Sequence, residues 1–312
     1  MNKTNEWLKT TLFKNYTIET ALADASFRKY YRLRNGDKTA LLMDSSLEKD
    51  SLKSFLDVTT RLKGADVCAP KIFEQNIEEG YLILEDFGTT HYLDILNQNN
   101  FKAFYTKAIN TILKMQKADV SGLALYDKKF LHVEMDLMQE WYLEKFLHLT
   151  LSEPQKELIA TTLNAISDVV LQQPQDVFVH RDFHSRNILL KDDKKIGIID
   201  YQDAMNGAIT YDLVSLLKDC YVAYERKEIK KLALEFRDKK ALKVSDETFL
   251  KWFDFMGMQR HIKVLGVFSR LNIRDKKNGY LKDMPLTLKY VIDTAERYSE
   301  TKEFAKFLST IK

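Results

Sequence analysis

The glycines of this chain are few and far apart. No two of the ten lie closer than Gly80 and Gly88, which are eight positions apart. A G-x-x-x-x-G-K-[ST] phosphate loop and a G-x-G-x-x-G dinucleotide fingerprint both need closer glycines, so neither occurs in this sequence. If the chain binds a nucleotide, it does so without a glycine-rich loop. With only four prolines as well, the sequence favours a largely helical protein, because both residues weaken helix interiors.

Charge and cysteine content exclude several classes of protein. Lys and Arg number 48 against 45 Asp and Glu, with the two signs interspersed, which argues against nucleic-acid binding. Cys68 and Cys220 form no C-x-x-C pair, so we expect two core thiols in a reducing compartment rather than a zinc site or a disulfide framework. The polar start of the chain and the lack of an 18-residue apolar run predict a cytoplasmic protein that contacts no membrane.

The first part of the chain has the pattern of a small mixed domain. Asn35-Gly36 is a strong hairpin signal between two extended segments. The regular segments expected here are strands over residues 27–34, 39–43 and 81–84 and a helix over 47–63. The composition changes at residues 85–88. We therefore predict an N-terminal lobe over residues 1–86 with a hinge at 84–88.

Helical patterns dominate after this point, apart from one short group of strands. Ser152, followed by Pro154 and Gln155, is the start signal of a helix, because Ser caps the helix and Gln completes a capping box. The other expected elements are helices over 101–118 and 134–149 and strands over 177–179, 188–190 and 196–199. The sequence predicts an α+β fold, with a small β-rich lobe and a larger, mainly helical lobe over residues 89–312, separated by a cleft.

One segment among the short strands has a clear chemical pattern. His180-Arg181-Asp182 is followed by Asn187 and, thirteen residues further on, by Asp200. This H-R-D-x-x-x-x-N spacing is the catalytic-loop motif of kinases, in which Asp faces a substrate hydroxyl while Asn and a later Asp bind the magnesium ion that bridges the ATP phosphates. A lone Asp or Asn in a loop is usually a turn residue, but an ordered set around two strands favours catalysis.

Two histidines flank the candidate base. His180 and His184 have i, i+4 spacing, but no acidic third ligand follows them at a suitable position. A structural or hydrogen-bonding role is therefore favoured over a metal site. Either histidine could orient Asp182.

These residues resemble the aminoglycoside-phosphotransferase-like family of small-molecule kinases. The resemblance rests on segments 180–187, 200–203 and 210–217. More narrowly, the chain is similar to the bacterial cell-wall-recycling kinases that phosphorylate N-acetylmuramate and N-acetylglucosamine at C1. The segments that carry this narrower resemblance are 24–32, 84–88, 257–272, 274–275 and 279–281. It thus spans nearly the whole chain.

The resemblance implies a bilobal, protein-kinase-like fold that uses ATP and Mg²⁺. It assigns Asp182 as catalytic base, Asn187 and Asp200 as magnesium ligands, and the backbone around Glu85 to Phe87 as the adenine-binding hinge. In such folds an acid at the place of Asp212 commonly braces the catalytic loop, although the sequence supports a helix N-cap role equally. Asp203 is expected either to support the metal ligands or to contact substrate.

The chain departs from the kinase pattern in its first lobe. A kinase strand ends V-A-I-K, with the lysine on the nucleotide phosphates, whereas the comparable run here is Ala40-Leu41-Leu42-Met43. We expect Arg28 or Arg32 to replace the missing cation in part, the alternative being that both lie on a solvated outer face. Ser26, where a glycine loop would lie, is expected to bind a phosphate through its hydroxyl and backbone amide.

The C-terminal helices are expected to shape the sugar pocket. N-acetylmuramate carries a lactyl carboxylate, and Arg260, Arg270 and Arg274 are candidates for a charge-assisted contact with it. His261 lies beside Arg260 in a helix-like run. The alternative is that these side chains face water.

Two other functions remain open from the sequence. One is a related kinase that acts on an aminoglycoside, a choline-like alcohol or another sugar, but a polycationic aminoglycoside needs an acidic pocket, and residues 259–263 and 270–277 are basic. The other is a non-catalytic nucleotide-binding scaffold, suggested by the missing lysine and opposed by an intact Asp182, Asn187 and Asp200. The expected partner is a small-molecule amino sugar rather than a nucleic acid or a membrane.

Overall fold

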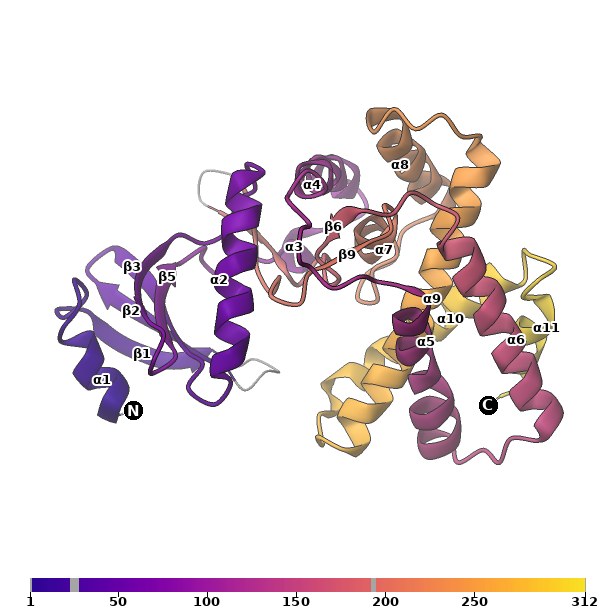
Figure 1. Ribbon diagram of the computed structural model, residues 1–312, viewed down its shortest axis with the longest axis horizontal. Coiled ribbons are helices and arrows are strands. Elements are labelled where there is room, and N and C mark those ends of the chain that lie inside the picture. Colours follow the sequence, from indigo (N-terminus) through magenta and orange to yellow (C-terminus); the bar gives the residue numbers. More distant parts are fainter. Residues whose placement is uncertain (1, 23–27, 192–194, 312) are drawn as a thin grey trace. The chain divides into compact units, whose positions relative to one another are not determined.

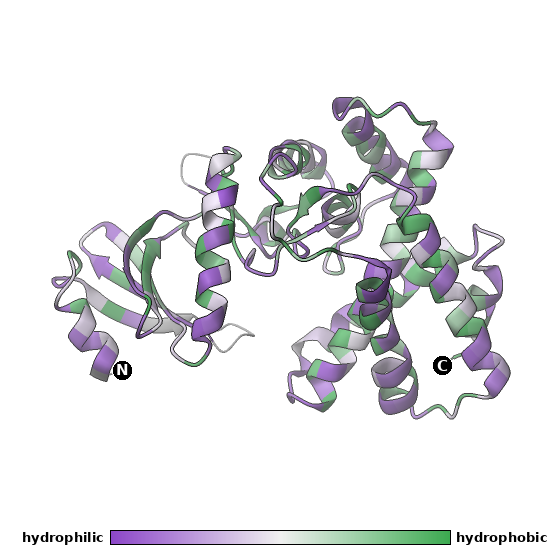
Figure 2. Ribbon diagram, in the orientation of Figure 1, coloured by the Kyte–Doolittle hydropathy of each residue, from purple (hydrophilic) through white to green (hydrophobic). Residues whose placement is uncertain are grey.

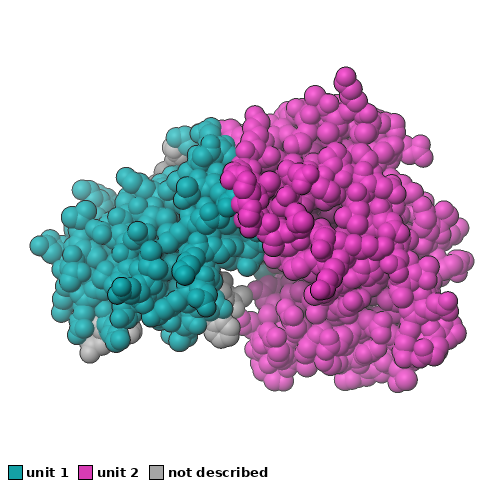
Figure 3. Space-filling model, in the orientation of Figure 1, with its two compact units in different colours: residues 1–95, 186–204 teal, residues 96–185, 205–312 magenta. Residues whose placement is uncertain are grey.

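The computed structural model describes residues 2–22, 28–191 and 195–311. They form two compact units, which Figure 3 shows in different colours. Unit 1 comprises residues 1–95 and 186–204, and unit 2 comprises residues 96–185 and 205–312. Unit 1 holds the main sheet and unit 2 most of the helices (Figure 1). The expected α+β fold, with a small β-rich part and a larger helical part, is confirmed.

Unit 1 is built on an antiparallel sheet of five strands in the order β1-β2-β3-β5-β4. The strands are β1 (Thr17–Leu22), β2 (Lys29–Asn35), β3 (Lys38–Asp44), β4 (Ile72–Asn76) and β5 (Tyr81–Glu85). β2 and β3 form the expected hairpin, in which Asn35 pairs with Lys38 and Gly36 has a φ of 59°, a conformation that glycine adopts at little steric cost. The sequence did not predict β1 or β4.

The two faces of this sheet differ. On one face, Leu8 of α1 (Asn2–Leu8) packs into an apolar cluster with Leu33 and Leu42. The central strands are among the most hydrophobic parts of unit 1 (Figure 2). Arg32 and Met43 lie on the opposite face, because residues paired across neighbouring strands share a side of the sheet. The helix α2 (Lys49–Gly64) runs beside the sheet (Figure 1).

A hairpin from the middle of the chain also belongs to unit 1. It consists of β7 (Ile188–Leu190) and β8 (Ile196–Ile198). The N–H of Ile198 donates to the carbonyl of Cys68 at 3.1 Å. Just after β8, the ring of Tyr201 stacks on Phe55 of α2 with centroids 5.1 Å apart, and its hydroxyl lies 2.8 Å from Thr59 Oγ1. The sequence predicted a nucleotide-binding lobe over residues 1–86 and a catalytic, sugar-binding lobe over residues 89–312. These boundaries and roles stay predictions.

Unit 2 is a bundle of helices around α9 (Asp246–Ile273), which is buried on nearly every side. Its other helices are α4 (Phe101–Met115), α5 (Lys128–Leu137), α6 (Glu153–Val170), α7 (Tyr211–Leu217), α8 (Arg226–Lys239), α10 (Met284–Ala295) and α11 (Lys302–Thr310), with the 3₁₀-helix η2 (Asn278–Asp283) before α10. The strands β6 (Val177–Val179) and β9 (Met205–Gly207) pair with each other, and α3 (Tyr92–Ile95) belongs to unit 1. No helix in the described ranges is long and apolar enough to cross a membrane.

Helix boundaries in unit 2 are confirmed at one place and wrong at another. α6 begins after Ser152 as expected, and Gln155 Oε1 accepts a hydrogen bond from the Ser152 N–H at 2.9 Å. The helix expected over 134–149 is instead α5 continued by a π-helix, η1 (Met138–Phe146). Apolar spacing does not distinguish an α-helix from a π-helix, whose turn holds one more residue on average.

Gly266 marks where α9 approaches the junction of α5 and η1. A Cβ placed on Gly266 would lie 2.6 Å from the Cβ and from the carbonyl oxygen of Leu137. Because backbone atoms cannot swing aside, we expect Gly266→Ala to lower the free energy of unfolding by about 1–3 kcal/mol, measured by denaturant titration. Gly279→Ala in η2 is the control, because open space surrounds that position. Equal stability of the two variants would contradict the close approach.

Candidate active site

A buried carboxylate holds the loop that carries Asp182. The loop follows β6, and Asp212, in the first turn of α7, accepts hydrogen bonds from the N–H groups of His180 at 2.8 Å and Arg181 at 3.0 Å. His180 Nδ1 accepts from the N–H of Asp182 at 3.3 Å. Burial raises the pKa of Asp212 to about 6, against the opposing effect of His180 and these N–H groups. The N-cap of α7 is Thr210, so Asp212 lies inside the helix rather than capping it. From there it holds the loop through these two hydrogen bonds.

Asp182 is half-buried and surrounded by positive charge within unit 2. Burial by itself would raise its pKa, but the charges of Lys263, His184, Arg260 and Arg181 outweigh burial and lower the pKa to about 2. The carboxylate is therefore ionised at neutral pH. It can accept the proton of a hydroxyl group placed against it.

Two of these cations share one buried carboxylate. Glu134 Oε1 lies 2.5 Å from Arg181 Nη2 and 3.0 Å from Lys263 Nζ, and Tyr126 donates its hydroxyl to the other oxygen. Burial would raise the pKa of Glu134, but Lys263 and Arg181 outweigh it and lower the pKa. Because a buried ion pair with further hydrogen bonds has a defined geometry, Glu134 fixes both cations beside Asp182.

Asn187 and Asp200 lie side by side on the β7–β8 hairpin of unit 1. Asn187 Nδ2 donates to Asp200 Oδ2 at 3.2 Å, and Gln202 Nε2 donates to Oδ1 at 2.9 Å. Asp200 is exposed and has a φ of 64°. An exposed carboxylate with a neighbouring side-chain amide fits Mg²⁺, which takes one or two protein ligands together with substrate phosphates. Among the described residues, no group of three or more His, Cys, Asp or Glu gathers as a metal site of protein ligands alone.

The two arginines expected to bind phosphate have different surroundings in unit 1. Arg32 donates two hydrogen bonds to the Asp86 carboxylate, at 2.7 and 3.0 Å. Arg28 is buried, and its guanidinium lies 5.7 Å from the centre of the Phe55 ring. Phe55 in turn stacks on Tyr201, the residue after the candidate metal ligand. Arg28 is thus close to the metal-ligand hairpin, whereas Arg32 is bound to the hinge.

The hinge residues contact the same hairpin. Glu85 Oε1 lies 2.5 Å from Lys191 Nζ, and this ammonium lies 4.6 Å from the centre of the Phe87 ring. A Cβ on Gly197 would come within 2.6 Å of the Phe87 ring, so glycine leaves the space that the ring fills. Ser26 lies outside the described residues, and its phosphate contact stays a prediction.

The expected sugar contacts are dispersed. Arg260, on α9, is 3% exposed and lies close enough to the candidate base to lower its pKa. His261 is also buried, with Nε2 2.8 Å from the carbonyl oxygen of Lys218. Arg270 is half-buried on α9, and Asp203 is exposed in unit 1, where Gln202 Nε2 donates to it at 3.4 Å. The roles of these four in sugar binding stay predictions.

Sequence reasoning missed two residues of the site. Lys263 is three positions after Arg260, and this helical spacing, which places both on one face of α9, was an available signal. Glu134 had no such signal. It lies more than a hundred residues from Lys263 in the sequence, and only the packing of α5 against α9 brings the two together.

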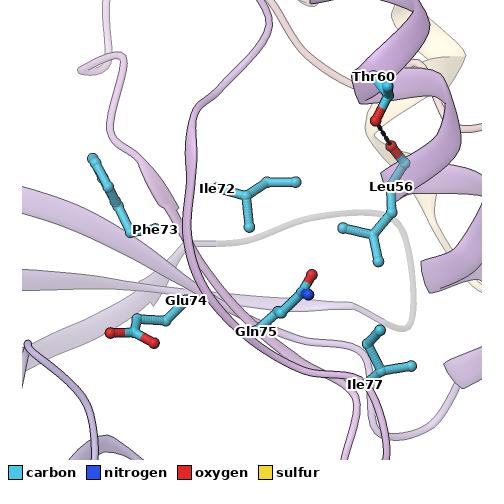
Figure 4. Close-up of a pocket in the computed structure, with 7 residues that line it drawn as sticks. All are labelled: Leu56, Thr60, Ile72, Phe73, Glu74, Gln75 and Ile77. Carbon is cyan, nitrogen blue, oxygen red and sulfur yellow. Dashed lines mark hydrogen bonds between the residues drawn. The ribbon is translucent and has the colours of Figure 1, made fainter.

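A hollow of about 540 Å³ lies elsewhere in unit 1, between α2 and β4 (Figure 4). Its lining combines apolar side chains with polar ones, of which Glu74 is the charged member. The lining residues are Leu56, Thr60, Ile72, Phe73, Glu74, Gln75 and Ile77. It contains none of the candidate hinge, metal or catalytic residues, so we do not assign the reaction to it.

Comparison with known proteins points to one family. The model of the phosphotransferase enzyme family matches residues 17–238. The N-acetylmuramate/N-acetylglucosamine kinase of Pseudomonas aeruginosa is 36% identical over 298 residues, covering 93% of this chain and 87% of that protein. A protein of the same description from Neisseria meningitidis serogroup B is 34% identical over 310 residues, covering 96% and 92%.

Solved structures show the same fold at lower sequence identity. The ADP-bound aminoglycoside phosphotransferase APH(2'')-Ib superposes with a TM-score of 0.64 at 16% identity, covering 94% of this chain and 98% of that one. The choline kinase LicA from Streptococcus pneumoniae gives 0.63 at 12% identity, with coverages of 94% and 98%. At such identities the likeness concerns the fold alone.

Proposed function

Because this chain belongs to the phosphotransferase enzyme family, we propose that it is an ATP-dependent kinase for N-acetylmuramate and N-acetylglucosamine in the recycling of cell-wall sugars. Two relatives of that description, 36% and 34% identical over nearly the full length, support the substrate class. We propose the anomeric C1 hydroxyl as the acceptor. The observation that carries the mechanism is the ionised Asp182 among fixed cations.

Asp182 acts as the base in the proposed reaction. The C1 oxygen attacks the γ-phosphorus, the bond from this phosphorus to the β–γ bridging oxygen breaks, and the hydroxyl proton passes to Asp182. A pKa near 2 makes this carboxylate a weak base, which suits an anomeric hydroxyl, since the ring oxygen makes it more acidic than an ordinary alcohol. The transition state of phosphoryl transfer is loose, so catalysis depends mostly on positioning the reactants and on neutralising the charge of the phosphate. In the proposed reaction, Lys263 and Arg181 supply positive charge for this purpose.

Asn187 and Asp200 are the proposed magnesium ligands. Bound there through Asn187 Oδ1 and the Asp200 carboxylate, Mg²⁺ would neutralise phosphate charge. Gln202, which donates to Asp200 at 2.9 Å, holds that carboxylate in place. Structural neighbours named as ADP-bound and ATP-bound complexes support the use of a nucleotide. Neither Cys68 nor Cys220 forms a disulfide, which supports a cytoplasmic location.

Of the two candidate arginines, Arg28 is the proposed phosphate cation. Met43, at the place of the strand lysine, is fully buried and uncharged. Arg28→Gln is therefore expected to raise the KM for ATP about tenfold, as for the loss of one charge-assisted hydrogen bond. Arg32→Gln leaves the buried Asp86 without its partner and should lower the melting temperature instead.

Arg34→Gln is the matched control for both variants. It removes the same charge from the same strand, where Arg34 forms an exposed pair with Glu19. Steady-state kinetics with varied ATP and thermal melting separate the two roles. An ATP KM that is unchanged by Arg28→Gln and raised by Arg32→Gln would reverse the assignment.

One experiment tests the proposed function. The purified protein is given Mg-ATP with N-acetylmuramate, with N-acetylglucosamine, with an aminoglycoside, or without sugar, and phosphorus NMR locates the new phosphate. Phosphate at C1 of either amino sugar supports the proposal. Phosphorylation of the aminoglycoside alone would assign another substrate class, and the absence of turnover with all three would favour a nucleotide-binding scaffold.

A further inference from the structure

Four basic side chains lie near Asp182, and three of them are already accounted for. Arg181 and Lys263 share Glu134 as their salt-bridge partner. His184 is buried, and burial lowers its pKa to about 4, so it is neutral at pH 7. The fourth is Arg260.

In the part of the chain that the structure describes, Arg260 forms no salt bridge with a carboxylate, unlike Arg181 and Lys263. It lies on the buried helix α9 with 3% of its surface exposed. Within the described residues, the hydrogen-bond partner of its guanidinium is the sulfur of Cys220, 3.6 Å from Nη1. A thiol is a weak acceptor, and a guanidinium has five donors. Asp182 and Asp219 act on its charge from nearby, but neither forms a salt bridge with it among the described residues. Donors of the guanidinium therefore remain for an anion.

The carboxylate of Asp219 does not fill this role. Asp219 is buried beside Arg260, but its oxygens accept hydrogen bonds from the N–H groups of Ser185 and Tyr221, both at 2.9 Å. His184 adds a second open donor or acceptor, because its Nδ1 is buried without a hydrogen-bond partner among the described residues. Arg260 is near enough to His184 to influence its pKa.

We propose that Arg260, with His184 beside it, binds the lactyl carboxylate of N-acetylmuramate, so that the pocket selects this anionic sugar over N-acetylglucosamine. This inference rests on the proposed function. A guanidinium binds a carboxylate through two parallel hydrogen bonds, and a neutral imidazole with its proton on Nδ1 can donate a third.

The chemistry of the sugar fits this placement. The lactyl group is attached at C3, which is the second neighbour of C1 in the ring. A side chain that binds its carboxylate must therefore lie within about one sugar ring of the base. The contacts of Arg260 place it near the loop that carries Asp182, because Arg260 contacts Cys220 and the adjacent Asp219 accepts a hydrogen bond from the N–H of Ser185, three residues after Asp182. N-acetylglucosamine has a neutral hydroxyl at C3 and leaves the guanidinium without an anion.

The test compares the acid with its ester. Wild-type enzyme and Arg260→Gln are assayed with N-acetylmuramate, with the methyl ester of its lactyl carboxylate, and with N-acetylglucosamine. We expect esterification and Arg260→Gln each to lower kcat/KM for N-acetylmuramate by about 10–100-fold, the effect of one charge-assisted contact. The variant assayed with the ester should show no larger loss of kcat/KM than either change alone, because both changes remove the same contact.

Two further variants separate recognition from structure. Because Arg260 also acts on the pKa of Asp182, Arg260→Gln is expected to lower activity on both sugars, but more strongly on N-acetylmuramate, so that the ratio of the two kcat/KM values falls. Arg260→Lys should restore part of the activity on N-acetylmuramate. Lys251→Gln is the control, because it removes one positive charge from the same helix in an exposed pair with Glu300. It should leave the ratio of the two sugars unchanged.

The outcomes distinguish this inference from the proposed function. Equal losses on both sugars in Arg260→Gln, or an ester as good as the acid with the wild type, would overturn the carboxylate site while leaving the kinase intact. If Arg260→Gln does not fold, the wild-type comparison of acid and ester decides alone. If the wild type phosphorylates neither amino sugar, the proposed function fails, and this inference fails with it.

Discussion

Asp182→Asn is expected to lower kcat by about 10²–10⁴-fold with either amino sugar, the range for removal of a general base. Asparagine has nearly the same shape but no negative charge, and it cannot take the hydroxyl proton. Glu134 still holds Arg181 and Lys263 in this variant, so the site keeps its form. ADP release at saturating sugar and ATP gives kcat, and the KM for ATP should change little.

The control for this variant is Asp168→Asn on α6. It removes the same charge from unit 2, but from a surface pair in which Asp168 lies 2.7 Å from Lys128. Exposed pairs of this kind contribute little to stability. Asp182→Asn with turnover close to that of the control would show that another group accepts the proton.

Asp200→Asn is expected to lower kcat/KM by about 10²–10³-fold, the usual effect of removing one preorganised charge-stabilising group. The change keeps an oxygen in the place of the ligand but removes the charge that attracts Mg²⁺. The concentration of Mg²⁺ that gives half-maximal rate should rise accordingly. A titration of the rate with MgCl₂ at fixed ATP measures this shift.

Asp37→Asn is the matched control, because Asp37 is an exposed turn residue of the β2–β3 hairpin in the same unit. Its magnesium titration should coincide with that of the wild type. An unchanged titration in Asp200→Asn as well would remove Asp200 from the metal site.

Local signals predicted those parts of the fold that local physics determines. Asn35-Gly36 defined a hairpin, because the turn needs a left-handed glycine. Ser152 and Gln155 marked the start of α6, because capping satisfies backbone groups within four residues. The β1 and β4 strands escaped prediction, because sheet edges are defined by pairing with distant strands rather than by their own sequence.

The candidate site follows the same rule: residues close in the sequence were found, and contacts between distant segments were not. The spacing of Asp182, Asn187 and Asp200 predicts a kinase-like site, and these three roles stay predictions. Arg28 or Arg32 was expected to replace the missing cation in part, and which of them binds phosphate stays a prediction. The sequence did not reveal that Arg32 pairs with Asp86, fifty-four residues away. Glu134 reaches the site through packing of one helix on another, which periodicity alone does not reveal.

The helix α9 combines two duties that are usually separate. It carries Arg260 and Lys263, whose charges act on Asp182, and its Gly266 fits against Leu137 with no room for a methyl group. Replacing α9 with the corresponding helix of a relative would therefore change two things at once. It would alter the residues near Asp182, and it would alter the surface that packs against Leu137 at the junction of α5 and η1. A chimera that folds should exchange α9 together with the α5–η1 segment, so that the two packed surfaces come from the same protein.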